Sequence, residues 1–483
     1  MSTEELVQLL LLCLHVVFGF TVAAHALLHK HDPRSAWAWI LACLLVPIGG
    51  AVIYFLFGVN RIHRRARLEV GSPQVPKDVV EDTAVAAIRG APDEEIAELV
   101  RISRAVTQRV LTGGNEVIAL HNGEIAYPDI IAAIKGARRR VWLMSYIFDR
   151  GDIGRQFAEA LRDAQQRGVQ VRVLLDGIGA FGHFFGGTAL LRRHGIQVAK
   201  FLPIRLVPPL FQINLRNHRK LICVDGTTAF VGGMNIGDHH ILAECTGTKN
   251  RWRLSRATAA DVHFRVHGPV VSQLDQVFQS DWEIATREKL EADSAPIEKS
   301  GGAHCRAITD GPNAEFSRYL IILLGALANA HRAVCIMTPY FIPPPELSSA
   351  LINAALRGIE ISLILPERSN HAWLDAATRR WLVQMSAFPI SVYRRPLPFA
   401  HSKLVIVDDY YTVIGSANLD SRSLSLNFEL MLEVYDQTFA RSMLAHFAQV
   451  RDSCRVLDAV ELKNRPMPKR LLDAFFWLFS PYL

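Results

Sequence analysis

The sequence predicts an α/β protein in which two copies of one domain stand in tandem behind a hydrophobic N-terminal hairpin. Three observations lead to this prediction. Two long apolar runs open the chain, at Leu6–Leu28 and Ala36–Phe57. Two strand–helix–strand patterns follow, each with a helical stretch between two short apolar, β-branched runs. Each pattern leads into nearly the same polar phrase, "NHRKLICVDGTTAFVGGMN" from Asn217 and "AHSKLVIVDDYYTVIGSAN" from Ala400.

Composition narrows the class of protein. The 483 residues are too many for one compact domain, and 50% of them are hydrophobic. The net charge of +7 favours an anionic partner, either lipid headgroups or nucleic acid. The seven cysteines show no recurring spacing, which argues against a disulfide framework and against a zinc site, and fits a reducing compartment.

The N-terminal runs predict two transmembrane helices within residues 1–60. About 20 apolar residues cross a hydrocarbon core, so each run is long enough to span. A cleaved signal peptide is the alternative for the first run, because Ala24–Ala26 resembles a cleavage site, but the acidic "STEE" before it disfavours that alternative. The arginine-rich "RIHRRAR" after the second run predicts that this flank and the domains beyond it lie in the cytoplasm.

The remaining chain divides at changes in composition. Residues 61–112 are predicted to form a helical connecting arm. The first repeat then occupies 113–286, a charged and glycine-rich linker covers 287–303, and the second repeat covers 304–483. Duplication favours a pseudo-two-fold arrangement in which the two polar phrases face each other at one composite site.

The last residues, "KRLLDAFFWLFSPYL", form a separate feature. Two cations precede a run of aromatic and aliphatic residues that is too short to cross a bilayer. This pattern predicts a segment that lies in the membrane interface, with burial against the protein's own core as the alternative.

The two polar phrases place the same residue types at the same spacing. In each phrase a His and a Lys two positions later fall on one face of a strand and project together. An Asn follows each His by 17 residues, after a small pair that lets backbone approach a ligand closely. The repeated polar residues are His218, Lys220, Asp225 and Asn235 in the first phrase and His401, Lys403, Asp408 and Asn418 in the second.

This constellation suits chemistry at a phosphodiester. Converging Lys and Asn side chains supply positive charge and hydrogen-bond donors for non-bridging phosphate oxygens. Two histidines on opposite sides of the phosphorus can divide the work, because one attacks while the other protonates the departing oxygen. Each imidazole needs an acidic partner, and the candidates are Asp261 and Glu429. Identical spacing in both copies disfavours the alternative of two ordinary surface pairs.

A second cluster of histidines does not predict a metal site. No ligand spacing recurs among them, so no metal and no cofactor is expected. These histidines are His239, His240, His263 and His267.

The two motifs resemble those of the phospholipase D superfamily. With "YIFDRGDIG", "TPYFIP", "RSLSLNFEL" and the hairpin, the likeness extends to bacterial cardiolipin synthases. It implies two phospholipase D-like domains, each a mixed β-sheet flanked by helices, and a metal-free phosphatidyl transfer between two phosphatidylglycerol molecules that yields cardiolipin and glycerol through a phosphatidyl-histidine. It also implies His218 as the nucleophile and His401 as the general acid and base. The motif aspartates Asp225 and Asp408 belong to the catalytic set, although in the family they are more structural than chemical.

The same resemblance implies the remaining roles. The two Lys and two Asn side chains would hold phosphate, and Asp261 and Glu429 would orient the histidines. The implied location is the bacterial inner membrane, with several spans, catalytic domains on the cytoplasmic side, anionic phospholipids as partners and no nucleic acid. The alternatives are a phospholipase D that uses water, a phosphatidyltransferase that uses another alcohol, a nuclease, and a non-catalytic lipid-binding scaffold. The hairpin disfavours a nuclease, and the intact motifs disfavour a scaffold.

Overall fold

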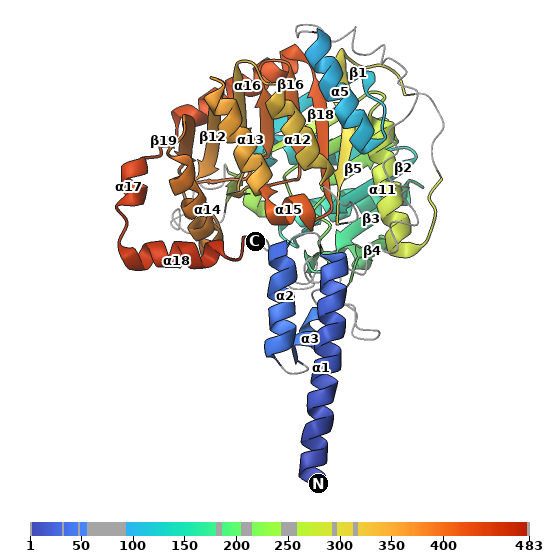
Figure 1. Ribbon diagram of the computed structural model, residues 1–483. Coiled ribbons are helices and arrows are strands. Elements are labelled where there is room, and N and C mark those ends of the chain that lie inside the picture. Colours follow the sequence, from blue (N-terminus) through green and yellow to red (C-terminus); the bar gives the residue numbers. More distant parts are fainter. Residues whose placement is uncertain are drawn as a thin grey trace, which may run out of the picture. The chain divides into compact units, whose positions relative to one another are not determined.

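The computed structural model describes residues 2–30, 33–46, 49–55, 93–179, 186–203, 215–242, 258–291, 297–312 and 317–480 (Figure 1). Two compact units make up the chain. One comprises Met1–Gly71 with Ile204–Ile213, and the other comprises Ser72–Pro203 with Asn214–Leu483. The residues of both polar phrases belong to the larger unit.

Helix α1 (Thr3–His29) dominates the N-terminal unit. Its start is fixed by a capping box in which the Ser2 hydroxyl accepts from the Glu5 backbone and the Glu5 carboxylate accepts from the Ser2 backbone. Of the described helices, α1 is the one long and apolar enough to cross a membrane. The first predicted span therefore forms the helix that was expected.

The second apolar run differs from the expected continuous helix. It forms α2 (Pro33–Leu45) and the short α3 (Gly49–Ile53). At 1.5 Å per residue α2 covers about 20 Å, which falls short of a core about 30 Å thick. Between the end of α2 at Leu45 and the start of α3 at Gly49 the sequence reads "VPI", and its proline lacks the amide donor that a helix interior uses. A two-span hairpin therefore stays a prediction.

A single sheet of 15 strands runs through the larger unit. Its order is the same when read outward from the centre in either direction: β1-β8-β6-β5-β2-β3-β4 on one side and β9-β18-β16-β15-β10-β12-β13 on the other, with β19 added at the second edge. This matching order confirms two tandem repeats related by a pseudo-two-fold axis. The antiparallel pairing of β1 with β9 joins the two halves, so the repeats share one sheet.

The strands have the following bounds. The first repeat contains β1 (Thr112–His121), β2 (Arg140–Ser145), β3 (Gln170–Asp176), β4 (Val198–Phe201), β5 (Leu221–Val224), β6 (Thr228–Gly232), β7 (Ala259–Ala260) and β8 (Val262–His267). The second contains β9 (Ala303–Asp310), β10 (Ala333–Met337), β11 (Phe341–Ile342), β12 (Glu360–Pro366), β13 (Ile390–Arg395), β14 (Phe399–Ala400), β15 (Leu404–Val407), β16 (Tyr411–Gly415), β17 (Leu419–Asp420), β18 (Glu429–Tyr435) and β19 (Arg455–Val456).

Both expected β-α-β units are present. The parallel pair β2–β3 is connected through α7 (Asp152–Gln166), and the parallel pair β10–β12 through α13 (Pro345–Leu356). Gly168 follows α7 with φ +89° and Gly358 follows α13 with φ +93°, a left-handed conformation that favours glycine after a helix. The repeated Arg-Gly-Val and Arg-Gly-Ile of the sequence are therefore helix ends.

Three hydrophobic cores lie against the sheet. One packs the helices of the first repeat, α6 (Asn122–Gly136), α7 and α9 (Gly186–Arg193). A second packs those of the second repeat, which include α12 (Arg318–Ala328), α13 and α14 (Ala372–Met385). The third draws on both repeats and includes Trp142, Leu221 and Val231 with Leu404, Ile414 and Leu432, together with α11 (Val271–Thr286) and α16 (Gln437–Asp452). The shared core holds the two polar phrases in a fixed relation.

The described part of the predicted connecting arm belongs to the second core. Helix α5 (Asp93–Thr107) buries Ile96 and Leu99 there, and the Ser103 hydroxyl donates to Glu433 at 2.9 Å. Glu433 also pairs with the buried Arg306 at 3.0 Å. The earlier part of the arm, residues 61–92, lies outside the described residues.

Four short elements complete the unit. They are η3 (Asp238–His240), α15 (Ser421–Ser425), α17 (Ala459–Lys463) and α18 (Met467–Trp477). Helix α18 packs against α14, and Figure 1 shows α14, α15 and α18 toward the same end of the larger unit. Residues 287–291 and 297–302, in the predicted linker, form neither helix nor strand.

Candidate active site

The backbone of each motif histidine is bonded to the other repeat. The amide of His218 donates to the carbonyl of Phe428 at 2.9 Å, and the amide of His401 donates to the carbonyl of Ala260 at 2.9 Å. Each acceptor directly precedes a predicted orienting acid, Glu429 in one case and Asp261 in the other. The sheet and the shared core therefore position each histidine beside an acid from the opposite repeat.

The side chains complete two crossed histidine–carboxylate pairs. Nδ1 of His218 lies 3.0 Å from both carboxylate oxygens of Glu429. Nδ1 of His401 lies 2.7 Å from Oδ2 of Asp261. Both carboxylates are buried, while each imidazole retains 14% exposure. Because Nδ1 is held in each ring, Nε2 is the nitrogen left for chemistry.

Burial and nearby cations favour neutral imidazoles. Burial lowers the pKa of His218, with Glu429 opposing that shift and Lys220 adding to it. The pKa of His401 lies well below its ordinary range because of burial, and the charges of Lys403 and Lys220 add to the effect. Before an anion binds, both histidines are therefore unprotonated at neutral pH.

The two orienting acids differ in environment. Although burial opposes ionisation of Glu429, contact with His218 and the charge of Lys220 hold its pKa below the ordinary value. Burial raises the pKa of Asp261 to about 6. The carboxylate paired with His218 is thus the more firmly ionised one, and it stabilises positive charge on that imidazole better.

The two carboxylates also differ in the hydrogen bonds that they accept. Glu429 accepts from the Ser416 hydroxyl at 2.5 Å, the Ser423 hydroxyl at 3.1 Å and the Asn427 amide at 3.2 Å. The Asp261 carboxylate accepts the Val262 backbone amide at 2.8 Å through Oδ1.

The Gly-Gly and Gly-Ser pairs of the motifs account for part of this asymmetry. A Cβ at Gly233 would lie 2.5 Å from Oδ2 of Asp261, so a side chain there would displace the carboxylate. The corresponding position in the second repeat is Ser416, which has room for its hydroxyl and uses it on Glu429. The preceding Gly232 and Gly415 have φ of +153° and +152°, a conformation that favours glycine.

The two lysines lie beside the imidazoles. Nζ of Lys220 donates to the His218 carbonyl at 2.6 Å, and Nζ of Lys403 donates to the His401 carbonyl at 2.5 Å. Nζ of Lys403 is also 3.2 Å from both ring nitrogens of His401. An ammonium has three donors and Lys220 uses one of them on the His218 carbonyl, so Lys220 keeps two for a bound anion. Burial holds the pKa of Lys220 well below its ordinary value and lowers that of Lys403 to about 8.

The motif asparagines are both buried beside these groups. Asn235 accepts the Ile147 backbone amide at 3.2 Å through its side-chain oxygen, and its amide nitrogen has no acceptor among the described residues. The amide nitrogen of Asn418 donates to Ser423 at 3.3 Å, which leaves it one N–H. Both side chains can still donate to a phosphate oxygen.

Both motifs lie in segments that match a known protein family. The family model described as "Cardiolipin synthase, PLD-like domain" matches residues 130–282 and 323–451, one segment in each repeat and more than half of the chain. The chain belongs to the cardiolipin synthase family. A second model, described as "Phospholipase_D-nuclease N-terminal", matches residues 12–58.

Members of this family resemble the chain over its whole length. The "Major cardiolipin synthase ClsA" of Bacillus subtilis (strain 168) is 29% identical over 497 aligned positions and covers 100% of both chains. The "Cardiolipin synthase A" of Pseudomonas entomophila (strain L48) is 31% identical and covers 97% of this chain and 96% of its own. That of Pseudomonas fluorescens (strain SBW25) is 32% identical and covers 88% of each.

A solved structure supports the fold. The phosphatidylserine synthase of Haemophilus influenzae Rd KW20 aligns with a TM-score of 0.57 at 16% identity and covers 80% of this chain and 100% of its own. At this identity the likeness concerns the fold alone, and it agrees with two tandem phospholipase D-like repeats.

The motif aspartates of this cardiolipin synthase family member bind backbone. Asp225 accepts the amides of Arg138, Arg139 and Arg140, which lead into β2. Asp408 accepts those of His331, Arg332 and Ala333, which lead into β10. Both aspartates have φ of +53°. Their position supports a structural role in each repeat, at the end of the motif strand away from the histidine.

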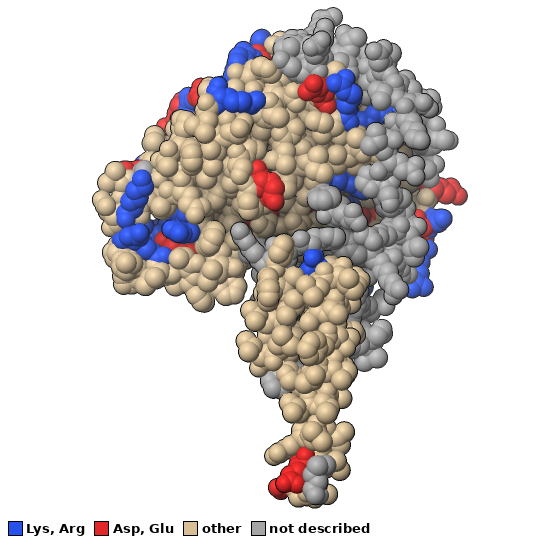
Figure 2. Space-filling model, viewed as in Figure 1, with Lys and Arg blue, Asp and Glu red and all other residues tan. Residues whose placement is uncertain are grey.

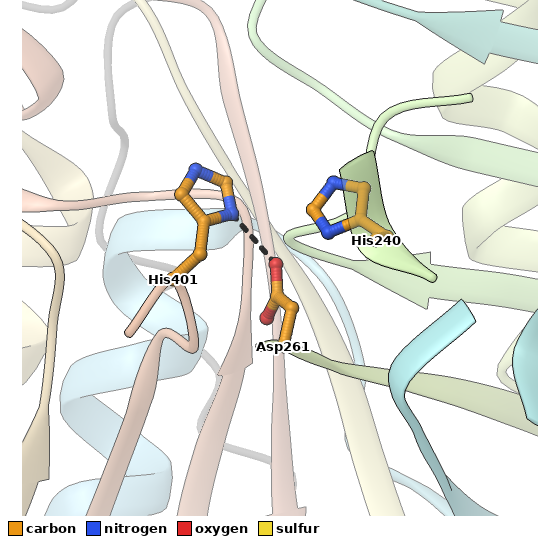
Figure 3. Close-up of side chains that lie close together, drawn as sticks. All are labelled: His240, Asp261 and His401. Carbon is orange, nitrogen blue, oxygen red and sulfur yellow. Dashed lines mark hydrogen bonds and ion pairs between the residues drawn. The ribbon is translucent and has the colours of Figure 1, made fainter. Parts of the chain in front are cut away.

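His240 forms hydrogen bonds with the backbone of two segments of the site. Its Nε2 accepts the Asn235 backbone amide at 3.3 Å, and its Nδ1 lies 3.3 Å from the Ala259 carbonyl. Figure 3 shows the His240 and His401 rings on either side of the Asp261 carboxylate, and the ring centroids of the two histidines are 5.7 Å apart. His240 therefore ties the loop that bears Asn235 to the segment that leads into Asp261.

These three side chains do not fit a metal ion. Ligand atoms of His240, Asp261 and His401 lie within 4.8 Å of one another. Both nitrogens of His240 and Oδ2 of Asp261 already take part in hydrogen bonds, and the Lys403 ammonium lies 3.2 Å from the His401 nitrogens. An ammonium in that position repels a cation.

Several supporting residues lie outside the set predicted from the sequence. Ser416, Ser423 and Asn427 hold Glu429, and the Tyr146 ring meets His218 edge-on at 5.4 Å and lies 5.5 Å from Nζ of Lys220. One signal was available, because the second phrase has Ser where the first has Gly233. The crossed pairing itself leaves no local signal, since the partners are 211 and 140 residues apart.

Proposed function

We propose that this enzyme is a cardiolipin synthase that transfers a phosphatidyl group from one phosphatidylglycerol to another and releases glycerol. The observation that carries the proposal is the pair of crossed histidine–carboxylate contacts, His218 with Glu429 and His401 with Asp261, within one cationic site. In this proposal one phosphodiester lies between the two imidazoles. The family of the chain supports phosphatidyl transfer as the reaction.

In the first half-reaction Nε2 of His218 attacks the phosphorus of the donor lipid. The P–N bond forms as the bond from phosphorus to the glycerol headgroup oxygen breaks, and His401 gives its proton to that oxygen. The imidazole of the phosphatidyl-histidine is positively charged while Nδ1 keeps its proton. The firmly ionised Glu429 stabilises that charge, which supports His218 as the nucleophile.

In the second half-reaction His401 acts as the base. It takes the proton from a headgroup hydroxyl of a second phosphatidylglycerol, and the oxygen of that hydroxyl attacks the phosphorus. The new P–O bond forms as the P–N bond breaks, which releases cardiolipin and restores neutral His218. Asp261 keeps the His401 ring oriented in both steps.

The negative charge of the bound substrate favours protonation of His401. In the empty site the pKa of His401 is low because of burial and because Lys403 and Lys220 are cationic. An anionic phosphodiester between these groups offsets the lysine charges and raises the pKa of His401. The acid therefore becomes available when a phosphate is bound.

Two alternatives use the same site with a different acceptor. A phospholipase D would use water and form phosphatidic acid, and another phosphatidyltransferase would use a different alcohol. The relatives named cardiolipin synthase favour a phosphatidylglycerol hydroxyl as the acceptor.

The apolar helix α1 and the family together support association with a membrane. We propose the bacterial inner membrane, with two spans and the catalytic unit on the cytoplasmic side, because arginines cluster after the second apolar run. Phosphatidylglycerol and other anionic phospholipids are the proposed partners, and nucleic acid is not.

The test is conversion of phosphatidylglycerol by the purified full chain in vesicles, with products resolved by mass spectrometry. The expected result is cardiolipin and glycerol in equal amounts, and loss of both in His218→Ala and in His401→Ala. Phosphatidic acid as the only lipid product would point to water as the acceptor. Appreciable cardiolipin from either variant would contradict the two-histidine mechanism.

A further inference from the structure

Helix α18 presents an apolar face to the outside of the catalytic unit. Leu471, Phe475 and Leu478 recur at spacings of four and three, which places them on one face of the helix. They are 63%, 53% and 66% exposed. Trp373, at the start of α14, is 44% exposed. Burial of the C-terminal run in the protein's own core, the alternative left open by the sequence, therefore does not hold for this face.

A buried ion pair fixes the helix in this orientation. Asp473 of α18 is 5% exposed, and its Oδ1 accepts from Arg379 of α14 at 2.9 Å. Its other oxygen pairs with Arg465. A surface helix of a soluble protein normally turns its apolar side inward and its charges outward. Here the acid is turned inward and the large apolar residues outward, so the arrangement suits an apolar surrounding.

Exposed cations accompany the apolar face. Lys469 and Arg470 in the first turns of α18 are exposed and have no ion-pair partner among the described residues. Figure 1 places α18 at the lower left of the larger unit. In Figure 2, which has the same view, the lower edge of that region is tan, with Lys and Arg side chains above it. Apolar residues with neighbouring cations complement the interface of an anionic bilayer. A second copy docked face to face would instead bring like charges together.

Aromatic rings connect this region with the catalytic centre. The exposed Trp373 stacks on His371 with centroids 4.7 Å apart, and His371 lies 6.2 Å from Tyr340. Tyr340 lies 6.1 Å from Phe399, and Phe399 lies 5.8 Å from His401. Exposure falls along this row, from 44% at Trp373 to 8% at Phe399. The row forms a series of neighbouring aromatic rings from the surface to the imidazole.

We propose that the α18 face, meaning Leu471, Phe475 and Leu478, docks with Trp373 on an anionic phospholipid bilayer. The aromatic row from Trp373 to Phe399 then forms the wall along which the lipid substrate reaches His401. The docking proposal is supported by the orientation of α18 alone. The role given to the aromatic row rests on the proposed function. All the residues of this docking surface belong to the larger unit.

Docking is tested by lipid quenching of a fluorophore on the full chain. Leu471→Cys is labelled with an environment-sensitive probe, and the protein is reconstituted in phosphatidylglycerol vesicles that contain nitroxide-labelled lipid. The matched control is Leu356→Cys, whose position is 66% exposed at the C-terminal end of α13. Because α13 returns from the carboxyl to the amino edge of the parallel strands, Leu356 lies at the edge away from the start of α14. The unsubstituted chain, labelled alike, gives the contribution of the native cysteines.

The expected result is strong quenching at position 471 and little at 356. Equal quenching at the two positions would overturn the docking proposal. Energy transfer between labelled copies at position 471 without lipid quenching would also overturn it, because the face would then bind a second copy.

A turnover assay tests the link to the active site. Leu471→Glu with Leu478→Glu is expected to lower turnover about tenfold on phosphatidylglycerol vesicles and to leave turnover of dispersed short-chain phosphatidylglycerol unchanged. Leu356→Glu serves as the control, and equal thermal unfolding of the variants excludes misfolding. Equal turnover of double variant and control on vesicles would contradict the proposal. If the native chain converts neither substrate, the proposed function fails, while quenching still decides docking.

Discussion

Nδ1 of His218 lies 3.0 Å from both carboxylate oxygens of Glu429, a residue 211 positions later in the chain. The relation is reciprocal, because Asp261 of the first repeat holds His401 of the second at 2.7 Å. Each of these two pairs therefore takes its histidine from one repeat and its carboxylate from the other. Duplication has therefore produced one site with two interlocked halves, and each half depends on the other for the tautomer and orientation of its imidazole.

Glu429→Gln tests the first of these contacts. Neutral His218 is needed for attack, so kcat/KM falls on the acid side as this histidine is protonated, and its lowered pKa places that limb below about 6.5. Glu429 raises the pKa of His218, so its removal moves the acid limb to lower pH. We also expect kcat to fall about 100-fold. The measurement is the pH profile of cardiolipin formation, with the exposed Glu360→Gln as control. If the acid limb does not shift, Glu429 does not control the protonation of His218 during turnover.

Gly233→Ala tests the contact between His401 and Asp261 without replacing a charged residue. A Cβ there would lie 2.5 Å from Oδ2 of Asp261, so the carboxylate must move away from His401. Turnover of phosphatidylglycerol is expected to fall about 100-fold, because a misplacement of about 1 Å is costly at a reacting centre. Gly136→Ala is the matched control, since a Cβ there meets nothing within 4 Å. Similar turnover of the two variants would show that the close approach has no role.

Asp408→Ala distinguishes a structural from a chemical role for the motif aspartates. The substitution leaves three backbone amides without their acceptor and is expected to reduce the free energy of unfolding by about 1–3 kcal/mol. The neighbouring Asp409 pairs with the exposed Arg332 and Arg441, so Asp409→Ala should cost less than about 1 kcal/mol. Denaturant unfolding and kcat per folded molecule are measured together. A stable but inactive Asp408→Ala enzyme would contradict the structural role.

Removal of divalent metal is expected to leave turnover unchanged. The candidate ligands His240 and Asp261 are already hydrogen-bonded, and Lys403 places positive charge against His401. The experiment compares cardiolipin formation before and after dialysis against a chelator. Loss of activity that zinc or magnesium restores would show that a metal takes part.

Much of the site followed from repetition in the sequence. Equal spacing from His to Lys, Asp and Asn in both phrases predicted a composite phosphate site, and the strand–helix–strand patterns predicted β2-α7-β3 and β10-α13-β12. Local pattern carries this information because side chains two apart share a face of a strand.

Other features depend on contacts that no local pattern records. The crossing of Glu429 to His218 depends on how the repeats pack, and so does the single sheet that joins them through β1 and β9. The second apolar run has the composition of one long helix, yet α2 ends at Leu45 and α3 begins at Gly49, with a proline in the sequence between them. The inward-facing Asp473 of α18 likewise depends on Arg379 and Arg465, which are 94 and 8 residues away in the chain.

The covalent role of His218 is tested with a phosphatidyl donor that carries a nitrophenyl leaving group, which departs without a general acid. With His401→Ala we expect a burst of about one equivalent of nitrophenol per enzyme, followed by a stall, because His218 is phosphatidylated and no base activates the acceptor. Intact-protein mass spectrometry would then locate the adduct on His218, and His218→Ala would give no burst. A burst from His218→Ala and none from His401→Ala would reverse the two roles, and the absence of a burst from both would contradict a covalent histidine intermediate.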